Sequence, residues 1–154
     1  MRILMVCLGN ICRSPSAEAV LRARADQRGL GQRLQIDSAG TGDWHVGKPP
    51  DARSQAAAAR RGYRLDDLRA RQVRAADFQE FDLLLAMDQD NLRTLRQRAP
   101  ASPRAELALL LAHAGLGECE VPDPYYGGEQ DFEQVLDLLE QASDALLDRL
   151  ELLL

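Results

Sequence analysis

The fold is decided by residues 6–15, which read V-C-L-G-N-I-C-R-S-P. The apolar run R-I-L-M-V at 2–6 precedes the motif and is typical of a buried strand. Ser14-Pro15 predicts a helix over 15–28, because proline suits the first helical position. The loop N–H groups and the helix N-terminus would therefore converge on one small volume, and such a nest binds a tetrahedral oxyanion.

Cys7 is the candidate nucleophile at the base of this loop, because cations and helix N-termini favour the thiolate form of cysteine. Arg13 would close over the anion, since its planar fork matches phosphate oxygens. Gly9 and Asn10 are residue types that tolerate the left-handed backbone of a tight loop. The Ser14 hydroxyl could donate to the thiolate, cap the helix, or do both. The alternative interpretation is that Cys7 is a buried structural cysteine and that Arg13 is a solvated surface arginine.

Size and composition indicate one domain spanning residues 1–154, with an ordinary globular balance of 45% hydrophobic and 28% charged residues. The formal net charge of −5 argues against a general nucleic-acid surface. No apolar run approaches the ~20 residues of a membrane span, and no signal-peptide pattern precedes the first strand. An odd count of three cysteines favours reduced thiols, so we expect a cytoplasmic protein.

Strand and helix patterns alternate along the chain, which predicts an α/β fold with a parallel sheet covered on both faces. Asp131 and Gln134 have the spacing of a helix cap. Ligands of such sheets bind beyond the carboxyl ends of the strands, where the Cys7 loop begins. The further predicted elements are strands at 33–37 and 82–87, helices at 51–62, 88–98 and 131–152, loops at 38–50 and 118–128, and strand or helix at 104–114.

Asp123 lies in the loop V-P-D-P-Y-Y at 121–126. Cleavage of a phosphate ester by a thiolate needs a separate acid that protonates the leaving oxygen. The two flanking prolines stiffen the backbone and would aim the carboxyl group. An Asp-Pro pair alone is most often a turn, so this role depends on a resemblance.

The chain resembles the low-molecular-weight protein tyrosine phosphatases over almost its whole length. Several separated motifs in the same order make the resemblance far more specific than the first motif alone. The matching segments are 6–19 (V-C-L-G-N-I-C-R-S-P-S-A-E-A), 37–41 (D-S-A-G-T), 44–53 (W-H-V-G-K-P-P-D-A-R), 70–73 (A-R-Q-V), 77–88 (D-F-Q-E-F-D-L-L-L-A-M-D), 91–92 (N-L) and 123–127 (D-P-Y-Y-G).

The resemblance implies a three-layer α/β sandwich, with a four-stranded parallel sheet and a phosphate-binding loop after the first strand. It also implies a two-step reaction. Cys7 attacks phosphorus while Asp123 protonates the tyrosine oxygen, and water then cleaves the cysteinyl-phosphate with Asp123 as base. Arg13 and the loop amides hold the phosphoryl group. No metal or cofactor is implied.

The resemblance also assigns residues that support the loop. Asn10, Ser14 and Ser38 look like the hydrogen-bond network that fixes it, and Asp88 looks like the support of the arginine. Several family members carry a histidine two residues before the A-R-Q segment, where this chain has Leu68. This departure predicts a rearranged or weaker asparagine network.

Trp44, Tyr125 and Tyr126 look like the walls of a slot for a phenyl ring, since aromatic walls stack on such rings. The alternative is that these three aromatic residues belong to the hydrophobic core. Leu8 and Ile11 belong to the phosphate loop, where Ile11 would add apolar contact.

Cys12 is either a small apolar filler or, by the resemblance, the partner of Cys7 in a reversible disulfide. Cys119 is expected to be a passive thiol. His45 and His113 have no metal-ligand spacing and are expected to be surface or structural histidines.

Two other functions compete with a tyrosine phosphatase. An arsenate reductase on the same fold would need resolving cysteines, and only Cys119 lies downstream. A phosphotyrosine-binding module would keep Arg13 but could dispense with Cys7 and Asp123. The expected partner is a tyrosine-phosphorylated protein, with a bacterial tyrosine kinase as one candidate, and the chain is expected to be a monomer or weak dimer.

Overall fold

One sheet of four parallel strands forms the centre of the computed structural model, which describes residues 1–154. The strand order β2-β1-β3-β4 confirms the predicted parallel α/β architecture. In β1 each residue from Arg2 to Cys7 pairs with one from Gln35 to Gly40 in β2. The strands are β1 (Arg2–Cys7), β2 (Gln35–Gly40), β3 (Leu83–Ala86) and β4 (Glu106–Leu109).

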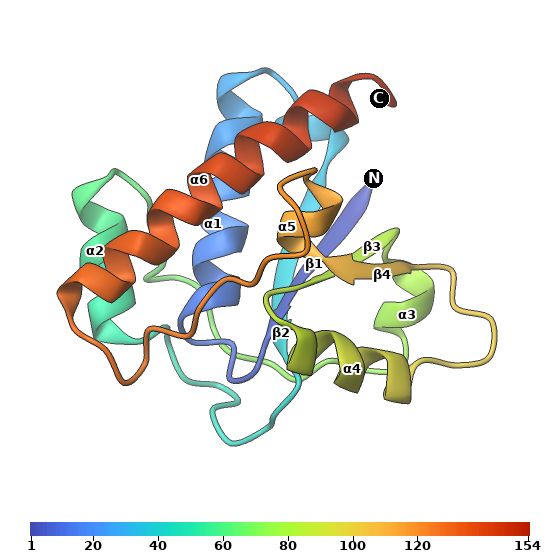
Figure 1. Cartoon of the computed structure of the whole chain (residues 1–154), viewed down its shortest axis with the longest axis horizontal. Helices are drawn as coiled ribbons and strands as arrows, with labels where there is room; N and C mark the ends of the chain where they lie inside the picture. The colour runs from blue at the N-terminus through green and yellow to red at the C-terminus, as the bar shows by residue number, and fades with distance from the viewer.

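Helices cover both faces of the sheet, as the alternation of patterns predicts (Figure 1). Because side chains alternate along a strand, Ile3 and Met5 of β1 face one hydrophobic cluster, and Leu4 and Val6 face the other. The first cluster is covered by α1 (Arg13–Gln27), α5 (Leu110–His113) and α6 (Glu129–Glu151). The second is covered by α3 (Asp77–Glu80) and α4 (Gln89–Arg98), while α2 (Ala52–Arg60) packs beside α6 and a 3-10 turn, η1, spans Gly31–Arg33.

The first and last helices begin earlier than the sequence predicts. Helix α1 starts at Arg13, so Pro15 lies inside its first turn and Ser14 is not a cap. Proline is tolerated there because the first N–H groups of a helix have no partner within it. Helix α6 starts at Glu129, and the Asp131 carboxylate reaches back to the N–H of Gly128. Asp131 therefore holds the third position of the helix, where it satisfies the N–H of the N-cap residue Gly128, and is not itself the cap.

Two segments contain short elements that the sequence pattern does not resolve. The ambiguous stretch 104–114 contains both a strand, β4, and a helix, α5. The single turn α3 was not predicted, because four residues are too few to show a helical period.

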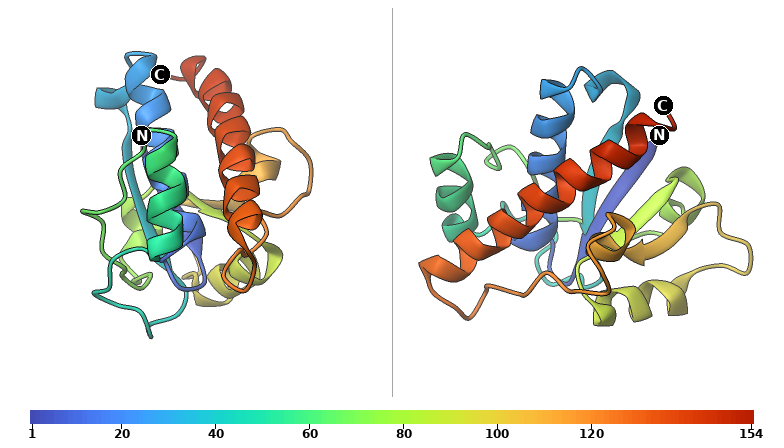
Figure 2. Two further views of the ribbon diagram at one scale, coloured as in Figure 1. Left: turned by 90° about the vertical axis from the view of Figure 1, so that its left-hand side faces the viewer. Right: turned by 45° about the horizontal axis from the view of Figure 1, so that its top comes forward.

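Strand β1 lies between β2 and β3, so the strand that follows it is added on one side and the next strand on the other side, and the strand order reverses at β1. Parallel sheets bind ligands at such a point, beyond the carboxyl ends of the strands. Residues 8–12 join β1 to α1 at this edge, while both chain termini lie near each other on the opposite side of the molecule (Figure 2). The topology thus puts the predicted phosphate loop where a ligand site belongs.

Candidate active site

Residues 8–12 form a tight loop that turns on Asn10. Asn10 has a φ of 57°, and it is the one residue other than glycine with a positive φ. Its N–H points back to the Cys7 Sγ at 3.3 Å. The N–H groups of Gly9, Ile11 and Cys12 donate to no other group of the protein. The loop therefore keeps backbone donors available for an anion, as in other oxyanion nests.

Cys7 ends β1 and is 3% exposed, with its sulfur at the base of this loop. The Ser14 Oγ lies 3.0 Å from its Sγ. Of the two arrangements that the sequence allowed for Ser14, the structure has the contact with Cys7 and not the helix cap. A hydroxyl at this distance can donate to a thiolate.

Arg13 is 3% exposed and enters the site from the first residue of α1. One terminal nitrogen, Nη1, donates to Asp88 Oδ2 at 2.6 Å and to the Val121 carbonyl at 3.0 Å. Burial alone would lower the pKa of the guanidinium, but the charges of Cys7 and Asp88 outweigh burial and raise it. Arg13 is therefore a fixed, fully charged group whose Nη2 and Nε stay free of hydrogen bonds.

The two carboxylate oxygens of Asp88 make different contacts. Oδ2 holds Arg13, while Oδ1 accepts the N–H of Asn91 at 2.8 Å and caps α4. The orientation of the arginine is thereby tied to a helix N-terminus on the opposite face of the sheet.

A cavity of about 280 Å³ opens above the loop. Asp123 stands on its wall, with Oδ2 3.7 Å from Arg13 Nη2 and Oδ1 accepting the N–H of Tyr125 at 3.0 Å. The volume suits one aromatic ring with its phosphate rather than a large ligand. The other lining residues are Cys7, Leu8, Gly9, Ile11, Cys12, Arg13, Trp44, His45, Tyr125 and Tyr126.

The three predicted rim aromatics all line this cavity, and none of them belongs to the core. Trp44 is 58% exposed and Tyr126 is 94% exposed. The Tyr125 ring packs edge-on against Tyr126, with 5.0 Å between ring centroids, and Arg53 lies over the Tyr125 ring. Such open aromatic faces are available for stacking.

The asparagine network is complete despite Leu68. Asn10 Nδ2 donates to the Oγ atoms of Ser14, at 2.8 Å, and Ser38, at 3.0 Å. Asn10 Oδ1 accepts the backbone N–H of Arg71 at 3.0 Å. Leu68 instead packs against the hydrophobic core. A backbone N–H thus supplies the third hydrogen bond without a histidine at position 68, and the rearrangement or weakening expected from Leu68 stays a prediction.

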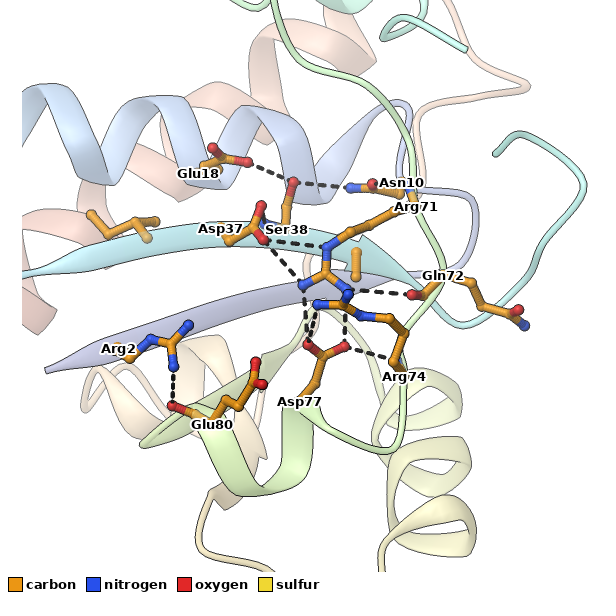
Figure 3. A network of polar contacts seen from close by, with 12 residues as sticks. Arg2, Asn10, Glu18, Asp37, Ser38, Arg71, Gln72, Arg74, Asp77 and Glu80 are labelled. Atoms are coloured by element: carbon orange, nitrogen blue, oxygen red, sulfur yellow. Dashed lines mark hydrogen bonds and ion pairs between the residues drawn. The ribbon is translucent and has the colours of Figure 1, made fainter. Parts of the chain in front are cut away.

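The sequence did not single out Arg71, which lies between Asp37 and Asp77 in the structure (Figure 3). Its guanidinium joins Asp37 of β2 to Asp77 of α3, with Nη atoms 3.1 Å and 2.9 Å from the two carboxylates. Asp77 is fully buried. These ion pairs hold the backbone of Arg71, whose N–H orients Asn10. In the sequence, the three residues fall in the separate segments D-S-A-G, A-R-Q and D-F, and no pattern links them.

Cys12 and His45 also line the cavity. Burial raises the pKa of the Cys12 thiol to about 12, so Cys12 stays protonated at neutral pH; all three cysteines are free. His45 was expected to be a surface or structural residue. Its imidazole stands over Gly9, and its buried Nδ1 has no hydrogen-bond partner.

A thiol beneath free loop amides, with an arginine and a carboxylic acid beside it, is the arrangement expected of a cysteine-dependent phosphatase, and the fold and the site favour that class. No helix is both long and apolar enough to cross a bilayer, and no cluster of His, Cys, Asp or Glu side chains is arranged to hold a metal ion.

Comparison with known proteins gives the family. The family model described as low molecular weight phosphotyrosine protein phosphatase matches residues 2–152. A low molecular weight protein-tyrosine-phosphatase of Streptomyces coelicolor is 49% identical over 151 residues, which cover 95% of this chain and 91% of the relative. The chain therefore belongs to the low molecular weight phosphotyrosine protein phosphatases, and it hydrolyses phosphotyrosine as a phosphoric monoester hydrolase.

Solved structures agree with this assignment. A protein tyrosine phosphatase from Entamoeba histolytica is 41% identical, with a TM-score of 0.92, covering 98% of this chain and 97% of that one. Wzb from Vibrio vulnificus, solved in complex with benzylphosphonate, is 28% identical, with a TM-score of 0.84, covering 96% of this chain and 97% of its own.

Proposed function

We propose that this phosphatase works by two displacements at phosphorus on Cys7. The thiolate attacks the phosphoryl group and expels the tyrosine oxygen, and water then releases inorganic phosphate from the cysteinyl-phosphate. The observation that carries the proposal is the position of the Cys7 sulfur, beneath free loop amides and beside the Ser14 hydroxyl. A metal ion plays no part in this scheme.

Arg13 binds the phosphoryl oxygens with Nη2 and Nε, because Nη1 is already held by Asp88 and Val121. The loop amides bind the remaining oxygens. Their donors are in place before substrate arrives, so little reorganisation opposes the charge that builds up in the transition state.

Asp123 is the proposed acid in the first step and base in the second. Its position on the cavity wall, 3.7 Å from Arg13 Nη2, supports this role. The Tyr125 N–H holds one carboxylate oxygen, Oδ1, and the other, Oδ2, faces Arg13 Nη2.

We propose that the phenyl ring of phosphotyrosine packs between Trp44, Tyr125 and Tyr126. The benzylphosphonate bound by Wzb combines an aromatic ring with a phosphonate, which supports the same fit here. A phosphoserine side chain is too short to bring its phosphate to Cys7 while filling the slot between these rings.

The natural substrates are phosphoproteins, and we propose an autophosphorylated bacterial tyrosine kinase among them. Bacterial relatives from Synechocystis and Streptomyces coelicolor are 49% identical, against 38% for the human relative, which supports a bacterial setting. A nucleophilic thiol works only when reduced, so we also propose the cytoplasm as its location.

The test is a matched set of phosphotyrosine, phosphoserine and phosphothreonine peptides, with p-nitrophenyl phosphate as reference. The proposal predicts phosphate release from the phosphotyrosine peptide and the aryl ester, with EDTA present. Cys7→Ser should abolish turnover while the protein still binds inorganic phosphate. Turnover by Cys7→Ser would refute the mechanism.

Two further outcomes separate the competing functions, the second in an assay of arsenite production. A binding module would release no phosphate from any ester. An arsenate reductase would produce arsenite from arsenate with a thiol reductant, but the third cysteine, Cys119, is exposed and does not line the cavity.

A further inference from the structure

The Arg53 side chain connects two parts of the active site that are far apart in the sequence. It lies in the first turn of α2, which packs beside α6 (Figure 1). Its guanidinium carbon is 5.4 Å from the centroid of the Tyr125 ring and 4.7 Å from that of the Phe132 ring. Both separations are within the range of a cation–π contact. Arg53 therefore contacts a wall of the active-site cavity and the first turn of α6 at once.

The phosphate loop fixes the orientation of this guanidinium. Arg53 Nε and Nη2 donate to the two carboxylate oxygens of Asp51 at 3.1 Å and 3.0 Å. The N–H of Asp51 in turn donates to the carbonyl of Ile11, in the phosphate loop, at 2.8 Å. A two-point contact between a guanidinium and a carboxylate sets the plane of the guanidinium as well as its position. Arg53 is thus held at a place that the phosphate loop defines.

The other end of the connection is the loop that carries Asp123. The Tyr125 ring lines the active-site cavity, and the Tyr125 N–H donates to Asp123 Oδ1 at 3.0 Å. Tyr125 is 37% exposed, so the protein core does not enclose its ring. A contact that fixes the position of Tyr125 therefore also helps to fix the carboxyl group of Asp123.

Open space beside the guanidinium makes this contact important. A second cavity, of about 260 Å³, is lined by six residues that include Arg53 and Phe132 but not Tyr125. Arg53 therefore has the Tyr125 ring on one side and open space on another. Without the guanidinium, that space would extend to the ring, and a side chain stays in one position only where its neighbours fill the alternatives.

We propose that Arg53 is a positioning residue that holds Tyr125 at the wall of the active-site cavity and so aims the Asp123 carboxyl group at the leaving oxygen. The proposal rests on Asp123 being the acid of the first step. Arg53 itself makes no contact with the substrate in this scheme, so its effect should extend to small aryl phosphates that carry no peptide.

The experiment compares kcat/KM for phenyl phosphate with kcat/KM for p-nitrophenyl phosphate. This parameter covers the steps up to cleavage of the P–O bond, and only the phenolate of phenyl phosphate needs an acid to leave. The ratio of the two values therefore reports how well the acid is aimed. A change in ring binding affects both substrates and cancels in the ratio, and so does a change in the fraction of folded protein.

Arg53→Met keeps the length of the side chain and removes its charge and its two-point contact with Asp51. We expect this variant to lower the ratio by about two- to fivefold, which is the factor that one exposed cation–π contact supplies. Arg53→Lys keeps a charge near the ring and should recover part of the loss. In a Tyr125→Ala background the ring is absent, so Arg53→Met should lower the ratio no further.

Arg64 provides the matched control. Its Nε and Nη2 donate to Asp66, two residues away, at 3.2 Å and 3.0 Å, which repeats the arrangement of Arg53 and Asp51. The arginines that lie over aromatic rings are Arg2 and Arg53, so the guanidinium of Arg64 has no such contact. Arg64→Met should therefore leave the ratio unchanged.

An unchanged ratio in Arg53→Met, or an equal fall in Arg64→Met or in the Tyr125→Ala background, would overturn the role of Arg53. A loss confined to phosphotyrosine peptides with acidic neighbours would also overturn it, because Arg53 would then bind a carboxylate of the substrate. Failure of the proposed function would look different: Asp123→Asn would not lower the ratio, and Arg53 would have no acid to aim.

Discussion

The end of β2 offers a sharp test of how the sheet shapes the phosphate loop. Gly40 pairs with Cys7, and a Cβ added at Gly40 would lie 2.7 Å from the Leu8 carbonyl oxygen, 3.1 Å from Gly9 C and 3.2 Å from Asn10 N. All three obstacles are backbone atoms of the loop. The first contact is about 0.7 Å closer than ordinary van der Waals contact, so Gly40→Ala must push the loop away from β2.

The magnitude follows from that displacement. Overpacking of this kind destabilises proteins by about 1–3 kcal/mol. Misplacement of a reacting group by about 1 Å can lower a rate by roughly 100-fold, so a shift of this size should lower kcat by about 10- to 100-fold. Because the loop amides are the proposed phosphate donors, affinity for inorganic phosphate should fall as well.

The assay is steady-state hydrolysis of p-nitrophenyl phosphate, with urea denaturation to confirm folding. Gly9→Ala is the matched control, because its Cβ meets the His45 side chain at 2.9 Å, and a side chain can move aside. Its kcat should fall by less than about tenfold. The reasoning is refuted if Gly40→Ala retains the kcat of the unaltered protein, or if Gly9→Ala is the more damaged variant.

Other substitutions test the supports of the site. Asp88→Asn can still cap α4 but loses the charged contact with Arg13, so kcat should fall while the free energy of unfolding changes little. Asp88→Ala also loses the cap, so its free energy of unfolding in urea denaturation should be about 1 kcal/mol lower than that of Asp88→Asn. Burial would raise the pKa of Asp77, but Arg71 outweighs it and lowers the pKa below the ordinary value, so its stabilisation is present above that value and lost as pH falls. The difference in thermal midpoint between the unaltered protein and Asp77→Asn should therefore be largest near pH 7 and shrink below pH 4, and a constant difference would contradict this reasoning. Asp123→Asn should slow hydrolysis of phosphotyrosine peptides by roughly two to four decades but that of p-nitrophenyl phosphate much less, because nitrophenolate leaves without an acid; equal losses on both substrates would argue against Asp123 as the acid.

Much of the fold could be read from the sequence because its signals are local. The apolar runs at 2–6 and 82–87 became β1 and β3, and the heptad-like face of the last helix packs in the core. The first and last residues of the helices were less predictable. Helix α1 begins at Arg13 because the loop closes directly onto the first turn, and no propensity of Ser14-Pro15 reveals that.

Those parts of the site that lie within one short motif were predictable from the sequence. Those parts in which residues from distant segments meet were not. The contacts of Cys7 and Ser14 lie within a single loop-helix unit. By contrast, the Arg71 pairing with Asp37 and Asp77 joins three separate segments, and the hydrogen bond from Ser38 to Glu18 joins a strand to a helix. Such pairings exist only in the folded chain, so residue type and spacing give them no distinct signature.

The central claim is that the phosphoryl group is transferred to the Cys7 sulfur. The direct measurement is the intact and digested mass of Asp123→Asn, quenched during turnover of p-nitrophenyl phosphate. With an easily expelled phenolate, the first step remains fast while the second lacks its base, so a phosphoryl group should accumulate on residue 7. Continued hydrolysis with no phosphate bound to that residue at any time would contradict the account.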